Sequence, residues 1–237
     1  MRKLQRVVFG IPLLIASLGC AQSETQDAAQ VSSPPVESGK GRTVTLRVFN
    51  YAHVSSGHLA KGEDEASCIF RRVGLEVRWV NYLPAAKDGH MAVSSQGDCK
   101  PADLFLSILS PEEWAAVHRR HTHALGFAAV PEEGARSSWA YISWSEVESE
   151  SQRVGTDREE DYVLGCVMAH EIGHLLLRTT RHTLTGLMRA HWGQNEMRLA
   201  TQRYLRFTPT EARLLRAEVA ARALAPAAQT AALRRAR

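Results

Sequence analysis

Apolar residues along the first two thirds of the chain fall into short segments that are typical of β-strands, separated by segments with helical spacing. The expected strands are 43–50, 75–80, 103–109, 125–130 and 139–144. Residues 58–73 have apolar positions at helical spacing, and 111–121 predicts a short helix or an irregular connection. A turn rich in Pro, Gly, Arg and Ser joins the last two strands as a hairpin.

A longer helical pattern follows over about 157–177. Thr156 and Glu159 are spaced as a capping box at its start. Apolar residues cover so much of its surface that we expect a mostly buried helix. Small residues recur every four positions, which would let a neighbouring helix or sheet approach closely; they are Gly165, Ala169 and Gly173. The pattern over about 208–224 predicts a C-terminal helix.

The first 21 residues have the layout of a secretory signal, with basic residues before a short apolar core at 7–18. Cleavage after Ala21 would release a free protein. The sequence Ser17-Leu18-Gly19-Cys20 also resembles a bacterial lipobox, in which Cys20 would carry lipid. We expect export to the bacterial cell envelope, the periplasm or the extracellular space, with membrane contact only through that possible lipid anchor.

Charge and composition narrow the remaining classes. The 237 residues carry a net charge of +4, and loss of 1–21 removes three basic and no acidic residues, which leaves +1. So small a charge gives no general attraction to nucleic acid. Residues 22–42 predict a flexible linker, 43–225 a single domain and 226–237 a basic disordered tail. We expect a monomer.

Export also affects how the cysteines are interpreted. Cys68 and Cys99 lie in the same region of an exported chain, which favours a disulfide between them. Cys166 then remains as a buried thiol or, alternatively, as a metal ligand one turn before His170.

The long helix carries the sequence His170-Glu171-Ile172-Gly173-His174, an H-E-x-x-H motif. Residues four apart lie one above the other on a helix, so both imidazoles would face one point where a zinc ion can sit. Glu171 would act as general base on a water whose pKa the metal lowers. The alternative is a buried helix whose two histidines are satisfied by core hydrogen bonds.

This motif, followed by His182 and by Gly186-Leu187-Met188, resembles the metzincin branch of the zincin metallopeptidases. The segment also resembles a group of exported bacterial proteins with a zincin-like core. The resemblance implies one catalytic Zn²⁺ ion, with Glu171 as base and Met188 in a Met-turn beneath the metal. The ligands it implies are His170, His174 and His182.

The turn between helix and third histidine departs from the family pattern. Leu177 and Thr180 stand where the family has its glycine and its third histidine, so the turn to His182 is two residues longer. Glu196 and His191 are rival third ligands. Asn195-Glu196 resembles the second-helix Asn-Glu of thermolysin-like gluzincins, although Ala200 replaces the aspartate expected there.

Other polar residues are less specific. Tyr204, Arg189 and His191 are candidates to stabilise an oxyanion, and the sequence does not rank them. The histidines of the HRRHTH segment would form a second metal site or, more simply, a solvated basic turn; they are His118, His121 and His123.

The resemblance implies an α+β, metzincin-type fold, with a mixed sheet whose antiparallel edge strand (125–130) lies over the active-site helix, and a C-terminal helix. An extended peptide could pair with that edge. The first hypothesis is therefore an exported zinc metallopeptidase acting on a peptide or protein substrate. The second is an envelope-tethered, non-catalytic metal-binding or structural protein with the same fold.

Overall fold

The computed structural model describes residues 42–82, 103–117, 124–130, 139–153, 155 and 159–235. The predicted signal, Cys99, Thr156 and the HRRHTH histidines lie outside these residues. In chain order the elements are β1 (Thr43–Asn50), α1 (Ser56–Arg72), β2 (Glu76–Tyr82), β3 (Leu104–Leu109), α2 (Pro111–Val117), β4 (Gly126–Ala129), β5 (Trp139–Ser143), α3 (Trp144–Arg153), α4 (Glu160–Leu177), α5 (Gln194–Thr201) and α6 (Pro209–Arg235).

The strands form a five-stranded mixed sheet in the order β2-β1-β3-β5-β4. β1 pairs in parallel with β2 and β3, and β3 pairs in parallel with β5. β4 is the exception, because it runs antiparallel to β5. Its first residue, Gly126, pairs with Ile142 of β5. The predicted strands and the antiparallel strand at the sheet edge are therefore confirmed, within an α+β architecture.

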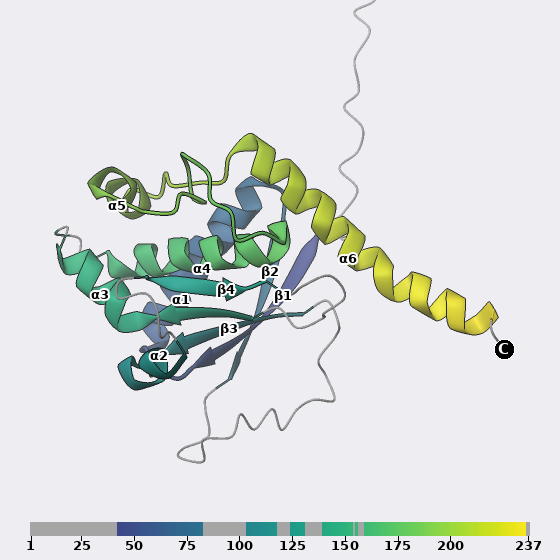
Figure 1. The fold of residues 1–237 in the computed structure, drawn as a ribbon, viewed down its shortest axis with the longest axis horizontal. Helices are drawn as coiled ribbons and strands as arrows, with labels where there is room; N and C mark the ends of the chain where they lie inside the picture. The colour runs from purple at the N-terminus through teal and green to yellow at the C-terminus, as the bar shows by residue number, and fades with distance from the viewer. Residues whose placement is uncertain are drawn as a thin grey trace, which may run out of the picture. The chain divides into compact units, whose positions relative to one another are not determined.

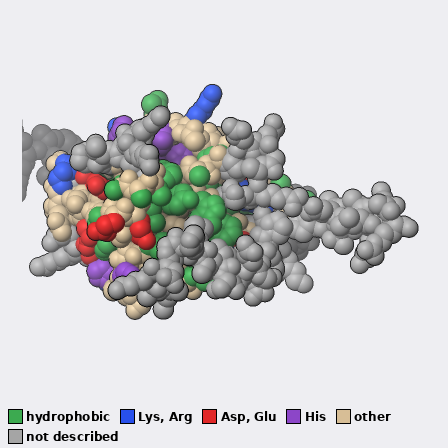
Figure 2. All heavy atoms as spheres, turned by 60° about the horizontal axis from the view of Figure 1, so that its bottom comes forward, with side chains coloured by type: hydrophobic (Ala, Val, Ile, Leu, Met, Phe, Trp, Pro, Cys, Tyr) green, Lys and Arg blue, Asp and Glu red, His purple; other side chains and the backbone are tan. Residues whose placement is uncertain are grey.

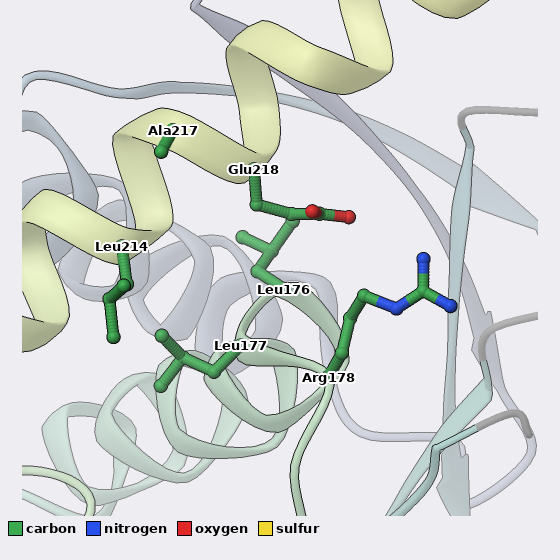
Figure 3. Close-up of a pocket in the computed structure, with 6 residues that line it drawn as sticks. All are labelled: Leu176, Leu177, Arg178, Leu214, Ala217 and Glu218. Atoms are coloured by element: carbon green, nitrogen blue, oxygen red, sulfur yellow. The ribbon is translucent and has the colours of Figure 1, made fainter. Parts of the chain in front are cut away.

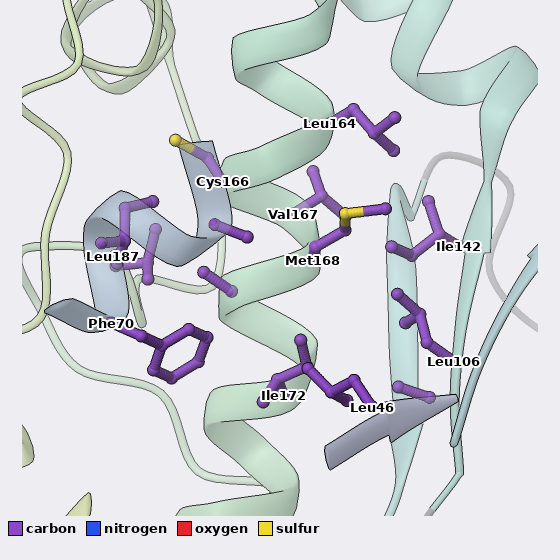
Figure 4. Close-up of a cluster of buried hydrophobic side chains, with 14 of the residues drawn as sticks. Leu46, Phe70, Leu106, Ile142, Leu164, Cys166, Val167, Met168, Ile172 and Leu187 are labelled. Carbon is purple, nitrogen blue, oxygen red and sulfur yellow. The ribbon is translucent and has the colours of Figure 1, made fainter. Parts of the chain in front are cut away.

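Two helices, α1 and α4, pack against each other and cover one face of the sheet (Figure 1). α4 also contacts α3, α5 and α6, so it lies at the centre of the domain. Apolar side chains on alternate strand positions meet it, among them Leu46, Leu106 and Ile142, which are fully buried. Figure 4 shows these three side chains facing Met168 and Ile172 of α4.

The small residues of α4 allow this close packing. A Cβ atom on Gly165 would lie 2.6 Å from the carbonyl oxygen of Gly62 in α1. A Cβ atom on Gly173 would lie 2.7 Å from the Sδ atom of Met188. Ala169 between them is fully buried. The predicted stripe thus brings α1 to one end of α4 and the Met188 segment to the other.

The opposite face of the sheet carries aromatic side chains, since the other alternate positions of the strands point there. Phe105 of β3 stacks on Trp139 of β5 with ring centroids 4.6 Å apart, and Phe127 of β4 stacks on Tyr141 at 4.8 Å. Trp114 of α2 contacts Phe127 from below. Figure 2 brings this side forward and shows hydrophobic side chains gathered in its middle.

One helix and two helix boundaries differ from the sequence-based expectations. Hydrophobic spacing did not predict the helix α3, because Val147 is its only buried apolar residue. The helix begins where the Ser143 hydroxyl accepts a hydrogen bond from the Glu146 N–H. α4 begins at Glu160, and Glu159 makes no side-chain capping bond. α6 runs to Arg235 and so includes much of the segment predicted as a tail. None of the described helices is long and apolar enough to cross a bilayer.

Candidate metal centre

The centre of the site lies on the C-terminal half of α4. His170 and His174 are one helical turn apart and both buried, with exposed fractions of 8% and 5%. Their rings meet edge to face with centroids 4.7 Å apart. The i, i+4 spacing on a helix thus puts both imidazoles on one side, as the sequence motif predicts.

His182 joins this pair from the segment that follows the helix. Its Nε2 atom lies 3.2 Å from the Nε2 atom of His174, which in turn lies 3.1 Å from that of His170. These three side chains form a group of potential ligand atoms within 4.8 Å of one another. Ligands on a tetrahedral zinc ion at about 2.0–2.1 Å are separated by about 3.3 Å, so the spacing fits one such ion.

Backbone carbonyls fix the orientation of the two helical rings. His170 Nδ1 lies 2.7 Å from the Leu187 carbonyl oxygen, and His174 Nδ1 lies 2.7 Å from that of Thr179. A carbonyl oxygen only accepts, so each Nδ1 must carry the proton and donate it. Both Nε2 atoms then present lone pairs to each other, an arrangement that a cation between them would stabilise.

Burial keeps these imidazoles neutral. It lowers the pKa of His170 to about 3, against the opposing effect of the bond to Leu187. Burial also lowers the pKa of His174, and it lowers that of His182 with a smaller contribution from nearby His191. Neutral imidazole is the form that binds a metal ion.

The longer turn to His182 is made possible by one left-handed residue. Arg178 has φ 51° and ψ 43°, and its N–H donates to the His174 carbonyl, which ends α4. Leu177, at the position of the family's glycine, is the last residue of the helix. The chain therefore turns one residue later than the family pattern and reaches the site at His182, with Thr180 exposed to solvent.

Met188 lies beneath α4 in a tight turn. The Thr183 N–H donates to the Met188 carbonyl at 2.9 Å, and Gly186 within the turn has φ 80°. Met188 is 1% exposed and packs against Gly173. Gly173 lies in α4 between His170 and His174. The turn thus supports the face of α4 next to the histidines, and Leu187 within it supplies the carbonyl that holds His170.

Glu171 lies against the first residue of the edge strand, Gly126 of β4. It is 4% exposed, and its Oε2 atom has no hydrogen-bond partner. Burial raises the pKa of its carboxyl to about 8. A buried carboxyl group without a partner at one oxygen is costly in a purely structural role, and such groups are enriched at functional sites.

The rival ligands have other contacts. The Glu196 carboxylate accepts the Gly193 N–H at 3.0 Å and the Arg189 guanidinium at 2.5 Å, which caps α5. His191 is exposed and does not join the three-histidine group. Cys166 is fully buried in the hydrophobic core, as Figure 4 shows, and burial raises the pKa of its thiol.

The candidates for oxyanion stabilisation also differ in their surroundings. Arg189 pairs with Glu196, as described above. The Tyr204 ring is 64% exposed and lies under the Arg206 guanidinium. Cys68 on α1 is half-buried and forms no disulfide with any described residue; its predicted partner Cys99 lies outside them.

Two further contacts at the site left no recognisable signal in the sequence. The Trp192 indole N–H donates to the Leu187 carbonyl at 3.3 Å, and its ring meets His170 edge to face. The carbonyls of Leu187 and Thr179 belong to the backbone, so no residue type marks them. The sequence indicates Leu187 only indirectly, because it precedes Met188 in the expected Met-turn.

Within the described ranges, a second group of side chains that could bind a metal is formed by His58, Glu160 and Asp161, and it is an ion-pair cluster. His58 Nδ1 lies 3.2 Å from Glu160 and 3.5 Å from Asp161, and Lys61 Nζ lies 2.9 Å from Asp161. These contacts join the start of α1 to the first turn of α4, where the two acidic residues suit the dipole of α4.

A shallow groove of about 310 Å³ lies past the end of α4, against α6 (Figure 3). Leucines form its apolar part, and Arg178 and Glu218 stand at its rim. None of the three histidines lines this groove.

No protein-family model matches the chain, and no curated protein matches it. Among solved structures, the fold is similar to that of a zinc-dependent peptidase from Methanocorpusculum labreanum (strain Z). The TM-score is 0.46 at 14% sequence identity, over 72% of this chain and 99% of that chain. The function proposed below therefore rests on the geometry of the histidines and of Glu171.

Proposed function

We propose that the chain is a zinc-dependent metallopeptidase of the metzincin type, which hydrolyses peptide bonds with Glu171 as general base. The observation that carries the proposal is the convergence of three neutral imidazoles on one point, with Nε2 atoms 3.1 and 3.2 Å apart. His170, His174 and His182 would hold the ion, and three protein ligands leave one position open.

A zinc ion bound there would polarise a carbonyl group and make a water molecule acidic near neutral pH. The chain's own contribution is to orient the ligands through Leu187 and Thr179, whose carbonyls fix the tautomers of His170 and His174. Outer bonds of this kind also raise the basicity of the ligands. Met188 packs under the helix as the Met-turn residue of such a centre.

Glu171 would receive a proton at Oε2, the oxygen that has no partner. The carboxylate would take a proton from the attacking water, burial raises its pKa and so favours the protonated form that results, and this proton would then pass to the leaving amine.

β4 would position the substrate. It is antiparallel to β5 and pairs with no other described strand, so one of its edges is available among the described residues. An extended peptide can add to such an edge through main-chain hydrogen bonds. We therefore propose a peptide or protein substrate.

Exchange of Glu171 for glutamine tests this function. Glu171→Gln keeps the shape of the side chain and removes its basicity, so kcat should fall by about 10²–10⁴-fold while bound zinc is unchanged. Glu76→Gln, on the far edge of the sheet, is the matched control and should keep full activity. Proteolysis by Glu171→Gln at the wild-type rate would exclude the mechanism.

The proposal includes export through residues 1–21, with Cys20 as a possible lipid anchor, and action as a monomer. Fractionation of the producing cells, with and without Cys20→Ser, separates an anchored from a free protein. Retention of the uncleaved chain in the cytoplasm would contradict export.

A further inference from the structure

Gly126, the first residue of β4, lies directly against the proposed general base. A Cβ atom at this position would be 2.8 Å from Oε1 of Glu171 and 2.9 Å from its Cγ atom. Real Cβ atoms are almost never so close to a neighbour, because contacts below 3.0 Å are repulsive. The Glu171 side chain therefore contacts the backbone of the edge strand, in the space that a side chain at position 126 would otherwise occupy.

The other side of Gly126 is equally closed. The same Cβ atom would lie 2.8 Å from the Tyr141 carbonyl oxygen in β5. Because the Tyr141 oxygen belongs to the paired strand, it cannot move away without disturbing the sheet. A larger residue at position 126 would have to displace the Glu171 carboxylate, the edge strand, or both.

Backbone conformation does not account for this glycine. The glycines with positive φ among the described residues are Gly74, Gly155 and Gly186. Gly126 has no positive φ, so its backbone conformation does not require glycine. The close approach of Glu171 and of the Tyr141 carbonyl does require a residue without a Cβ atom.

We propose that Gly126 is a positioning residue for Glu171. Without a Cβ atom, β4 lies against the carboxyl group and determines where it points, which matters because Oε2 has no hydrogen bond to hold it. The same strand offers its edge to the peptide, so one backbone segment sets both the base and the substrate. This inference rests on the proposed peptidase function.

A double-mutant cycle in thermal stability tests the contact without any measurement of activity. Gly126→Ala should lower Tm by about 5 °C in the wild-type background. Glu171→Ala removes one of the two groups that the new methyl group meets, so in that background the loss should be smaller, and the part that remains comes from the Tyr141 carbonyl. Gly57→Ala is the control, since its nearest neighbour would be 3.9 Å away, and it should leave Tm unchanged or raise it slightly, because alanine favours the helix more than glycine does.

Kinetics of the Gly126→Ala variant test the consequence of the contact. A misplacement near 1 Å can cost about 100-fold in rate, so kcat should fall by about that factor while KM and zinc content stay within about threefold of wild type. A purely structural role would instead lower Tm and zinc content together and leave the kcat of the folded fraction unchanged.

The outcomes separate cleanly. Equal losses of Tm in both backgrounds, or an unchanged kcat, would overturn the inference. If Gly126→Ala fails to fold, folding of the double variant with Glu171→Ala supports the contact, and failure of both variants contradicts it. Absence of peptidase activity in the wild-type protein would refute the proposed function and the kinetic role of Gly126, while the Tm cycle would still decide whether the two residues are coupled.

Discussion

Arg178 ends α4 in a backbone conformation that its residue type does not predict. It adopts the left-handed region that favours glycine, one residue after the position where the metzincin pattern has glycine. For a residue with a Cβ atom this conformation costs about 1 kcal/mol. The turn is therefore made at some cost in stability, and its location could not be read from residue types.

Substitution at this turn should be favourable. We expect Arg178→Gly to raise the free energy of unfolding by about 0.5–1 kcal/mol, because glycine adopts this conformation without steric strain. Leu177→Gly is the matched control, since Leu177 is the last helical residue and packs against the core, and it should lower that free energy by more than about 1 kcal/mol. Urea denaturation measures both. Stabilisation by Leu177→Gly but not by Arg178→Gly would place the turn one residue earlier.

The buried carboxyl group of Glu63 on α1 should make the stability of the fold depend on pH, separately from the metal centre. Burial raises the pKa of its carboxyl to about 7, opposed by a hydrogen bond from Asn81 and assisted by the charge of Asp64. The folded pKa lies above the ordinary value of 4.5, so the fold favours the protonated form. Its contribution to stability is therefore complete at low pH and is lost as the pH rises through about 7.

Replacement of Glu63 by glutamine should remove this dependence. Relative to wild type, Glu63→Gln should raise Tm above pH 7, and the difference should vanish near pH 4.5, where wild-type Glu63 is protonated as well. Tm measured across this range, with exposed Glu76→Gln as control, tests the prediction. A difference that does not vary with pH would contradict it.

At the scale of elements, α5 and the turn before it act together to hold the site. Glu196 near the start of α5 accepts bonds from Gly193 and Arg189. Arg189 directly follows Met188, and Trp192 shares the Leu187 carbonyl with His170. Glu196, considered above as a rival ligand, is thus better explained as the anchor of this segment.

The two roles of Glu196 give opposite expectations. As an anchor, Glu196→Gln should retain zinc and lower the free energy of unfolding by about 1 kcal/mol through the weakened cap. As a ligand, the same change would abolish zinc binding. We expect His182→Gln to weaken zinc binding by more than the roughly 10–100-fold that loss of an outer-shell partner causes. Metal titration of the two variants decides between them, and zinc loss only in Glu196→Gln would reverse the assignment.

At the scale of the whole molecule, periodicity predicted most of the architecture. Short apolar segments located the five strands to within one or two residues, and the small-residue stripe of α4 predicted the close packing seen at Gly165 and Gly173. α3 escaped prediction because its contact with the core depends on one apolar residue, Val147. Hydrophobic spacing cannot reveal a helix with a single buried apolar residue.

The candidate site was predictable only in part, and for a physical reason. The H-E-x-x-H spacing places two imidazoles together on any helix, so His170 and His174 follow from local geometry. The approach of His182 depends on the conformation of Arg178, and the orientation of Glu171 depends on a glycine in a distant strand. Such tertiary contacts have no local sequence pattern.

On the proposed function, the three histidines hold one zinc ion and leave one coordination position open. X-ray absorption at the zinc edge of the purified protein tests it most directly. We expect one zinc ion per chain, with three imidazole nitrogens at about 2.0–2.1 Å and one further oxygen from solvent. A sulfur ligand at about 2.3 Å, a shell closed by four protein ligands, or the absence of stoichiometric zinc would contradict the account.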